Sequence, residues 1–197
     1  DGLVFEGDTY FGFFHPDALA NQVGIREAAP YELAADERRA ARSFPLPDRP
    51  PLPDRRWRMV EHVDALLTSG GPRGLGLIEG SGAVDPGAWF FEAHFLDDPV
   101  WPGSLGLESL LQLLKVFAED RWGLDAGAVF DSPALGVEHQ WTYRGQIVST
   151  NNRVTTRAVI TSIDDAARRV AADGWLLVDG KVIYQMNGFS LGVGASD

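Results

Sequence analysis

The chain has 197 residues, of which 45% are hydrophobic and 11% aromatic, so it can bury one full core and is not a disordered chain. Its formal net charge of −11 argues against nucleic acid as a partner, because phosphate binding requires a basic face. It has no cysteine, which excludes disulfides and thiolate metal sites and fits a reducing compartment such as the cytoplasm. No apolar run approaches the roughly 18 residues of a membrane span, so no membrane partner is expected.

The opening residues 1–14 look like a strand that follows a turn. Asp1-Gly2 is followed by apolar residues, as Asp179-Gly180 is near the other end of the chain. Recurrence of this kind can indicate a repeated unit. We therefore expect residues 1–14 to be the last strand of a preceding, similar unit. The alternative is chance, because an Asp-Gly turn before apolar residues is a common hairpin sequence.

The next stretch predicts a surface helix and then a linker. Strong helix formers fill Tyr31–Phe44, directly after Pro30. Five prolines follow within Phe44–Pro53, which predicts an extended segment. We therefore divide the chain into an N-terminal segment with its Pro-rich linker at 1–56 and a main domain at 57–197.

The main domain is mostly β-rich. Alternating residues predict strands over 57–69 and 74–84, with a Gly-Gly-Pro turn between them. Four further β-type segments follow in the second half of the chain: Gly136–Ser149, Arg153–Asp164, Arg168–Val178 and Lys181–Gly192. Their connections are short, which is typical of an antiparallel meander.

Between these two groups of strands lies the segment His94–Gln112, which joins one imidazole, a rigid turn around Pro102-Gly103 and an apolar helix. The apolar residues that recur at helical spacing are Leu107, Leu110, Leu111, Leu114 and Phe117. Other apolar residues fill most of the remaining face, and a helix that is apolar nearly all round must be buried. The sequence therefore predicts one long antiparallel sheet around a single buried helix.

This segment also carries residues suited to proton transfer. Glu108 is expected to be buried, and desolvation would then raise its pKa, while Gln112 lies one helical turn further on the same side. The free N–H groups of Gly103 and Ser104 form a cradle for a carbonyl oxygen or an anion. Together with the imidazole of His94, they suit chemistry next to a thioester. The plainer interpretation is that the histidine is structural and the glutamate only complements the helix dipole.

The string His94-Phe95-x-x-Asp98-Pro99-Val100-x-Pro102-Gly103-Ser104-Leu105-Gly106-Leu107-Glu108 resembles the active-site segment of hotdog-fold 3-hydroxyacyl-carrier-protein dehydratases. The resemblance is to the β-hydroxydecanoyl type and to the dehydratase domains of polyunsaturated fatty acid and polyketide synthases. The preceding Trp89-Phe90-Phe91 also matches, and the similarity extends from about Arg58 to Val193. It implies an α+β hotdog fold, in which a long antiparallel sheet wraps around one central buried helix.

The resemblance also implies a function, that of a dehydratase (a hydro-lyase) eliminating water from a 3-hydroxyacyl thioester to give a trans-2-enoyl thioester. In this family His94 would be the catalytic histidine and Glu108 the catalytic acid. The residues expected to bind the substrate are Gly103, Ser104, Gln112, Val100, Trp101 and Leu107. The β-hydroxydecanoyl branch carries Asp where this chain has Glu108, and the other bacterial branch carries Glu, so isomerase activity is not implied.

The same resemblance implies partners. The substrate would be carried on the phosphopantetheine of an acyl carrier protein, for which an arginine-rich cluster could be a docking surface: Arg38, Arg39, Arg42, Arg55, Arg56 and Arg58. A solvated helix face or linker is the alternative for this cluster. In the family, the histidine and the carboxylate of one site come from different hotdog units, so a homodimer or a neighbouring hotdog domain is expected.

No cofactor is expected, because elimination of water changes no oxidation state overall. No metal is expected either, since the other histidines lack ligand spacing: His15, His62 and His139. Two other functions remain open on the sequence. A hotdog thioesterase would need a carboxylate and a water, and a non-catalytic hotdog domain would serve dimerisation or carrier-protein docking.

Overall fold

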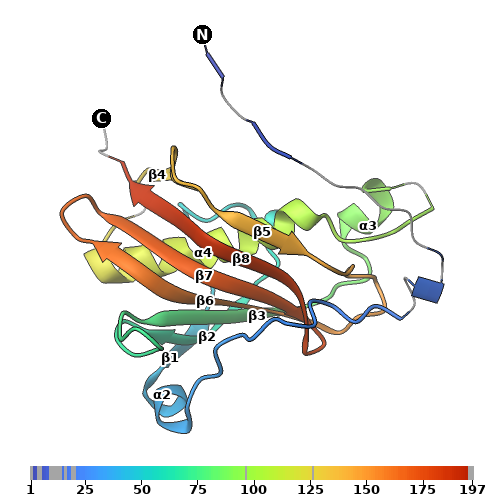
Figure 1. Cartoon of the computed structure of the whole chain (residues 1–197), viewed down its shortest axis with the longest axis horizontal. Coiled ribbons are helices and arrows are strands. Elements are labelled where there is room, and N and C mark those ends of the chain that lie inside the picture. The colour runs from blue at the N-terminus through green and yellow to red at the C-terminus, as the bar shows by residue number, and fades with distance from the viewer. Residues whose placement is uncertain are drawn as a thin grey trace.

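One long helix, α4, lies along one face of an antiparallel β-sheet (Figure 1). The structure is a computed structural model and describes residues 2–3, 6–8, 15, 17–18, 21–95, 97–125 and 127–194. Its helices are α2 (Ala35–Ala40), α3 (Trp89–Ala93) and α4 (Gly103–Trp122), with a 3-10 turn η1 (Arg55–Trp57). Its strands are β1 (Arg42–Pro45), β2 (His62–Leu67), β3 (Leu77–Ala83), β4 (Phe130–Asp131), β5 (Gln140–Tyr143), β6 (Arg153–Asp164), β7 (Arg169–Val178) and β8 (Lys181–Val193).

Within the described residues, the eight strands form one sheet in the order β1-β2-β3-β6-β7-β8-β4, and β5 pairs with another part of β8. Every pairing is antiparallel. The meander predicted for four segments is confirmed for the last three, and β6 has the predicted bounds. The first segment, predicted over 136–149, forms only the short β5, which pairs with β8 and not with β6. The predicted α+β hotdog fold, a long sheet around one helix, is therefore confirmed. In the helices of the described ranges, we find none with the length and apolarity needed to cross a membrane.

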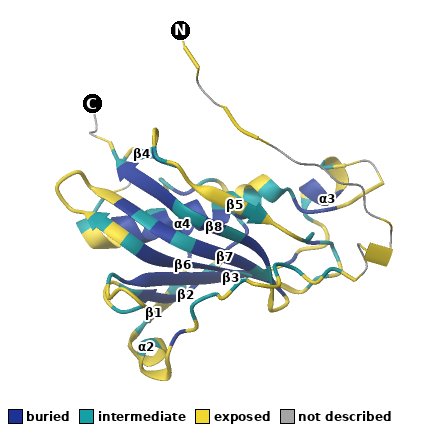
Figure 2. Cartoon of the chain, in the orientation of Figure 1, coloured by how far each residue is buried: buried dark blue, intermediate teal, exposed yellow. Residues whose placement is uncertain are grey.

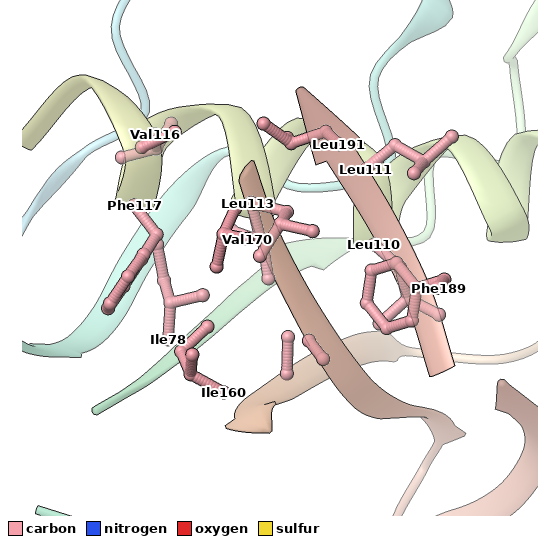
Figure 3. Close-up of a cluster of buried hydrophobic side chains, with 14 of the residues drawn as sticks. Ile78, Leu110, Leu111, Leu113, Val116, Phe117, Ile160, Val170, Phe189 and Leu191 are labelled. Atoms are coloured by element: carbon pink, nitrogen blue, oxygen red, sulfur yellow. The ribbon is translucent and has the colours of Figure 1, made fainter. Parts of the chain in front are cut away.

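The helix α4 begins directly after Pro102, and it ends at Gly123, whose φ of 59° allows the left-handed conformation of a helix end. Its fully buried side chains pack on residues of the central strands (Figure 3). The cluster includes Leu110, Leu113 and Phe117 from the helix and Ile78, Ile160, Val170, Phe189 and Leu191 from the sheet. Full burial of one such side chain contributes about 1.5–3 kcal/mol, so this cluster is the main source of stability.

The other face of the sheet is also covered. Along β6, residues alternate between the face that packs on α4 and the opposite face, where Val159 joins a second apolar cluster. That cluster includes Leu77 and Trp175 from the sheet, and Leu33 with Tyr31 from the segment before α2. Figure 2 shows the result, since β3 and much of β6 and β7 are coloured as buried.

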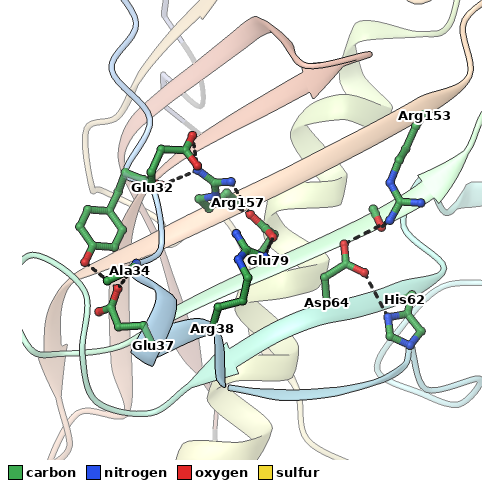
Figure 4. A network of polar contacts seen from close by, with 11 residues as sticks. Glu32, Ala34, Glu37, Arg38, His62, Asp64, Glu79, Arg153 and Arg157 are labelled. Atoms are coloured by element: carbon green, nitrogen blue, oxygen red, sulfur yellow. Dashed lines mark hydrogen bonds and ion pairs between the residues drawn. The ribbon is translucent and has the colours of Figure 1, made fainter. Parts of the chain in front are cut away.

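A buried ion pair lies on this second face (Figure 4). The Arg157 Nε donates to Glu79 Oε2 at 2.6 Å, and the two side chains are only 6% and 5% exposed. Arg38 reaches the same carboxylate at 3.1 Å, and Glu32 lies 3.0 Å from the Arg157 guanidinium. Arg157 also donates to the backbone oxygen of Tyr31. The pair therefore ties the segment before α2 to the sheet.

The segment before residue 57 differs from expectation. The helix predicted for residues 31–44 is only α2, because the chain then turns extended to pair as β1 with β2. The Pro-rich stretch is not a free linker, since Leu46 and Leu52 are buried in the core that contains α4. The boundary at 56/57 stays a prediction. So does the strand at residues 1–14, of which 1, 4–5 and 9–14 lie outside the described residues.

Replacing Arg157 with Met should destabilise the protein by about 3 kcal/mol, because Glu79 would stay buried with only the half-exposed Arg38 as its partner. The double replacement Glu79→Met with Arg157→Met should cost less than Arg157→Met alone. Denaturant unfolding measures both. As a matched control, Arg121→Met removes an exposed pair with Asp165 and should cost less than about 1 kcal/mol. Equal losses for Arg157 and Arg121 would contradict this account.

A second prediction concerns pH. Burial raises the pKa of the Glu119 carboxyl, although Arg49 partly opposes the shift with a hydrogen bond of 2.9 Å. A carboxyl whose pKa is higher in the folded than in the unfolded state lowers stability as pH rises from its unfolded pKa to its folded pKa. The stability of Glu119→Gln relative to the natural chain should therefore increase from mildly acidic to neutral pH. Unfolding curves across that range measure the trend, and the opposite slope would refute the assignment.

Candidate active site

His94 lies at the end of α3, where its backbone N–H donates to the Phe90 oxygen at 2.9 Å and closes the helix. The short helix is held by an aromatic cluster rather than by its own length, since the rings of Phe90 and Phe91 lie 4.8 and 6.2 Å from that of Trp101. The imidazole is half-buried and its ring centre lies 4.1 Å from that of Phe95. The histidine is thus fixed at its backbone while its ring stays within reach of a ligand.

One hydrogen bond indicates which ring nitrogen of His94 carries the proton when the imidazole is neutral. The Nδ1 of His94 lies 3.0 Å from the carbonyl oxygen of Val100. Because a carbonyl oxygen only accepts, Nδ1 carries the proton in the neutral ring and Nε2 keeps its lone pair. This is the form that a general base requires.

Val100 and Trp101 connect the histidine to the start of α4. Val100 forms an isolated antiparallel β-bridge with Val148, and the Trp101 N–H donates to the Ile147 oxygen at 2.9 Å. Both side chains are buried, at 4% and 3% exposure. Their backbone groups anchor the turn that carries His94, and the expectation that their side chains bind the substrate stays a prediction.

The start of α4 presents free donors, as the sequence predicts. The Leu105 N–H bonds to the Pro102 oxygen, but among the described residues the N–H groups of Gly103 and Ser104 have no acceptor. Gly103 is half-buried and Ser104 is exposed. These two N–H groups at the positive end of a long helix can bind a carbonyl oxygen or an anion.

The first turn of α4 lies directly on an aromatic ring of β8. A Cβ on Gly106 would come within 1.8 Å of a ring carbon of Tyr184, so only glycine fits at this position. The ring of Tyr184 is flanked by Tyr143 at 4.7 Å and Trp141 at 5.9 Å, both from β5. The sequence interpretation gave no role to these three aromatic residues. For Tyr184, the signals in the sequence were strand alternation and its place at the end of a stretch, 179–184, that resembles the dehydratase family.

Glu108 lies on the side of α4 that the sheet does not cover. Its carboxylate is 32% exposed and lies 3.7 Å from the Lys115 Nζ, so the expectation of a buried carboxylate is wrong for the single chain. The Gln112 Nε2 lies 3.3 Å from both the Glu108 carboxylate and the Trp57 backbone oxygen, as the spacing of one helical turn predicts. The fully buried Gln112 thus connects the glutamate to the backbone of Trp57, and Lys115 is a partner that the sequence interpretation missed.

The structure brings some predicted site residues together and leaves others apart. His94 contacts Val100, and Glu108 contacts Gln112. Leu107 is half-buried against the core and not part of either contact. No hydrogen bond or ion pair joins the imidazole to the Glu108 carboxylate within the described ranges. That part of the chain also contains no group of three side chains placed to hold a metal ion.

Comparison with known families agrees with the fold and with the sequence motif. The profile of the FabA-like domain matches residues 52–187, which is more than half of the chain. The chain belongs to the FabA-like domain family. The resemblance to hotdog dehydratases stated from the sequence is therefore confirmed at the level of the family.

Relatives of this FabA-like domain include one of the subunits of a polyunsaturated fatty acid synthase from Thraustochytrium sp., which is 30% identical over the whole chain. The chain spans 15% of the length of that relative. Among solved structures, the dehydratase heterocomplex ApeI:P from Xenorhabdus doucetiae matches with a TM-score of 0.50 and 11% identity, covering 73% of this chain and 87% of that one. A putative thioesterase from Lactococcus lactis matches with a TM-score of 0.49 and 7% identity, over 67% and 90% of the two chains.

Replacing Gly106 with Ala should destabilise this FabA-like domain by roughly 2 kcal/mol, because the new methyl group would force α4 away from the Tyr184 ring. A loss of stability would be diagnostic of the contact, since replacing Gly with Ala inside a helix otherwise stabilises the fold. Thermal or denaturant unfolding measures the loss. The matched control Gly87→Ala, whose Cβ would meet its nearest atom at 3.4 Å, should be nearly neutral. A Gly106→Ala protein as stable as the control would contradict the contact.

Proposed function

We propose that this FabA-like domain is a dehydratase domain of a fatty-acid or polyketide synthase, which eliminates water from a 3-hydroxyacyl thioester to give a trans-2-enoyl thioester. The observation that carries the proposal is the bond between the His94 Nδ1 and the Val100 oxygen. This bond leaves the Nε2 of His94 free to act as a base. His94 precedes the free N–H groups at the start of α4 by only nine residues in the sequence. Membership of the FabA-like family and the similarity to part of a polyunsaturated fatty acid synthase support it.

In the proposed mechanism, the Nε2 of His94 takes a proton from C2 of the acyl chain. The thioester oxygen accepts a hydrogen bond from the Gly103 N–H, which stabilises the negative charge that develops there. Glu108 in its protonated form gives a proton to the 3-hydroxyl, the C3–O bond breaks, and water leaves as the C2–C3 double bond forms. Solvent then returns a proton to the carboxylate and removes one from the imidazole. Each assisted proton transfer is worth about a hundred- to ten-thousand-fold in rate.

The proposal requires a second hotdog unit. Within one chain, the described residues show no contact between the imidazole and the carboxylate, and Glu108 is part-exposed on the side of α4 that faces away from the sheet. A second copy, or a neighbouring hotdog domain, would supply the carboxylate to His94 and would cover it. Burial at such an interface would favour its protonated form, which the donor role needs.

We further propose an acyl carrier protein as the carrier of the substrate, and no cofactor. Several arginines of the cluster proposed to dock the carrier protein are already paired within the chain. Arg55 and Arg58 both pair with Asp48, at 2.8 and 3.1 Å, and Arg58 is nearly buried. Arg56 lies 3.8 Å from Asp54, stacks on the ring of Trp57 and is 67% exposed. Arg39 is exposed and has no ion pair among the described residues, so Arg39 and Arg56 are the members of the cluster that are most available to an acidic partner.

Replacing His94 with Ala, or Glu108 with Gln, should lower the rate of hydration of a crotonyl thioester by at least about a hundredfold, because each removes one proton-transfer group. Absorbance of the enoyl thioester measures this rate. The exposed His139 is the matched control, and His139→Ala should keep the natural rate. Wild-type rates in His94→Ala would refute the assignment, and release of free acid from the natural protein would indicate a thioesterase instead.

Mixing the two inactive variants tests the shared site. If each site takes His94 from one copy and Glu108 from the other, mixed dimers contain one intact site. Random exchange of protomers should then restore about a quarter of the natural activity. No recovery after verified protomer exchange would show that both groups act from the same chain or with a different domain.

A further inference from the structure

We infer that the hydroxyl group of Tyr184 is a second hydrogen-bond donor for the substrate's carbonyl oxygen, beside the Gly103 N–H. The inference rests on the proposed dehydratase function and adds a residue to its carbonyl-binding site. Tyr184 belongs to β8, far along the chain from the motif that contains His94 and Gly103. The fold alone brings them together.

The position of the hydroxyl follows from two glycines of α4. The Tyr184 ring lies under Gly106, and its hydroxyl lies near Gly103, where a Cβ would be 3.7 Å from the oxygen. The same Cβ would be 3.8 Å from the nearest ring atom of Trp141. These are ordinary van der Waals separations, so the space between the helix start and the two aromatic side chains accommodates one further atom. That space is bounded by a hydroxyl on one side and a glycine at a helix start on the other.

The hydroxyl also lacks a partner. Tyr184 is completely buried, and in the described part of the chain its Oη forms no hydrogen bond. The Tyr143 phenol packs edge-to-face beside it and acts on it electrostatically, but no hydrogen bond of acceptable geometry joins the Tyr184 Oη to a described residue. An unpaired hydroxyl costs free energy when it is buried, and buried polar groups in native proteins are usually paired. Burial raises the pKa of the Tyr184 phenol, so the group stays protonated and acts as a donor.

The groups around the Tyr184 hydroxyl favour a hydrogen-bond acceptor as its partner. The hydroxyl lies beside the first turn of a 20-residue helix, where the N–H groups of Gly103 and Ser104 are also free. These groups are donors without a partner among the described residues, and an acceptor placed between them could bond to more than one of them. A carbonyl oxygen is such an acceptor. In the proposed reaction this oxygen gains negative charge when C2 loses its proton, so a second donor lowers the barrier more than it strengthens substrate binding.

The test replaces Tyr184 with Phe, which keeps the ring that packs on Gly106 and removes only the oxygen. Its matched control is Ser190→Ala, because Ser190 lies on the same strand and its Oγ is likewise buried and has no partner among the described residues. Two properties are measured for the natural protein and both variants. They are the steady-state hydration of a crotonyl thioester, and the carbonyl stretching frequency of bound butyryl thioester labelled with 13C at the carbonyl.

We expect Tyr184→Phe to lower kcat about a hundredfold with little change in KM, because a donor to a developing oxyanion acts mainly in the transition state. The carbonyl frequency of the bound thioester should shift back toward its value in solution. Ser190→Ala should match the natural protein in both measurements. Both variants should be at least as stable as the natural chain, since each removes an unpaired buried hydroxyl.

Natural kcat and an unchanged carbonyl frequency in Tyr184→Phe would overturn the inference and leave the proposed function intact. Loss of stability in Tyr184→Phe but not in Ser190→Ala would also overturn it, because the hydroxyl would then have a partner within the protein. A natural chain that forms no enoyl thioester in any assembly would instead refute the proposed function, and the inference with it.

Discussion

The close contact between the first turn of α4 and the ring of Tyr184 determines the position of the candidate active site. Because Gly106 has no side chain, the helix can approach β8 until backbone meets ring. The free N–H groups at Gly103 are consequently held at a fixed depth beside the aromatic residues of β5. The turn that carries His94 is anchored separately, through Trp101 and Ile147. Two independent attachments thus orient the imidazole and the helix start, and neither depends on the reacting groups themselves.

The groups proposed to react are less buried than those that hold them. His94 and Glu108 are part-exposed, whereas Gln112 and Trp101 are buried. Charged or titrating side chains are costly inside a core, so a fold can keep them reactive by placing them at its margin and burying only their supports. A margin is also where another hotdog unit can complete a site. This arrangement lets a very apolar helix carry the Glu108 carboxylate at its margin, with Lys115 as its counter-charge.

Much of the fold could be predicted from the sequence, because the long strands alternate cleanly and α4 repeats its leucines at helical spacing. The motif around His94 also indicated the helix start and its free donors. Burial of Glu108 could not be predicted, since composition shows that a helix is apolar but not which turn extends beyond the sheet. Tyr184 was missed for a different reason. Its role depends on packing against Gly106 from a distant strand, which no local pattern records. Pairing of β1 was missed because strong helix formers predicted a helix that continues to Phe44.

The residues before Trp57 have a practical consequence for recombining such domains. Leu46 and Leu52 enter the core beneath α4, Arg49 bonds to the nearly buried Glu119, and Leu33 covers the outer face of the sheet. A domain that begins after the last proline of this stretch would expose hydrophobic residues on both faces of the β-sheet, and such exposure promotes aggregation. Exchange of this FabA-like domain between proteins should therefore use a junction upstream of Gln22, whose side chain accepts a bond from the Gln146 N–H and belongs to the same folded unit.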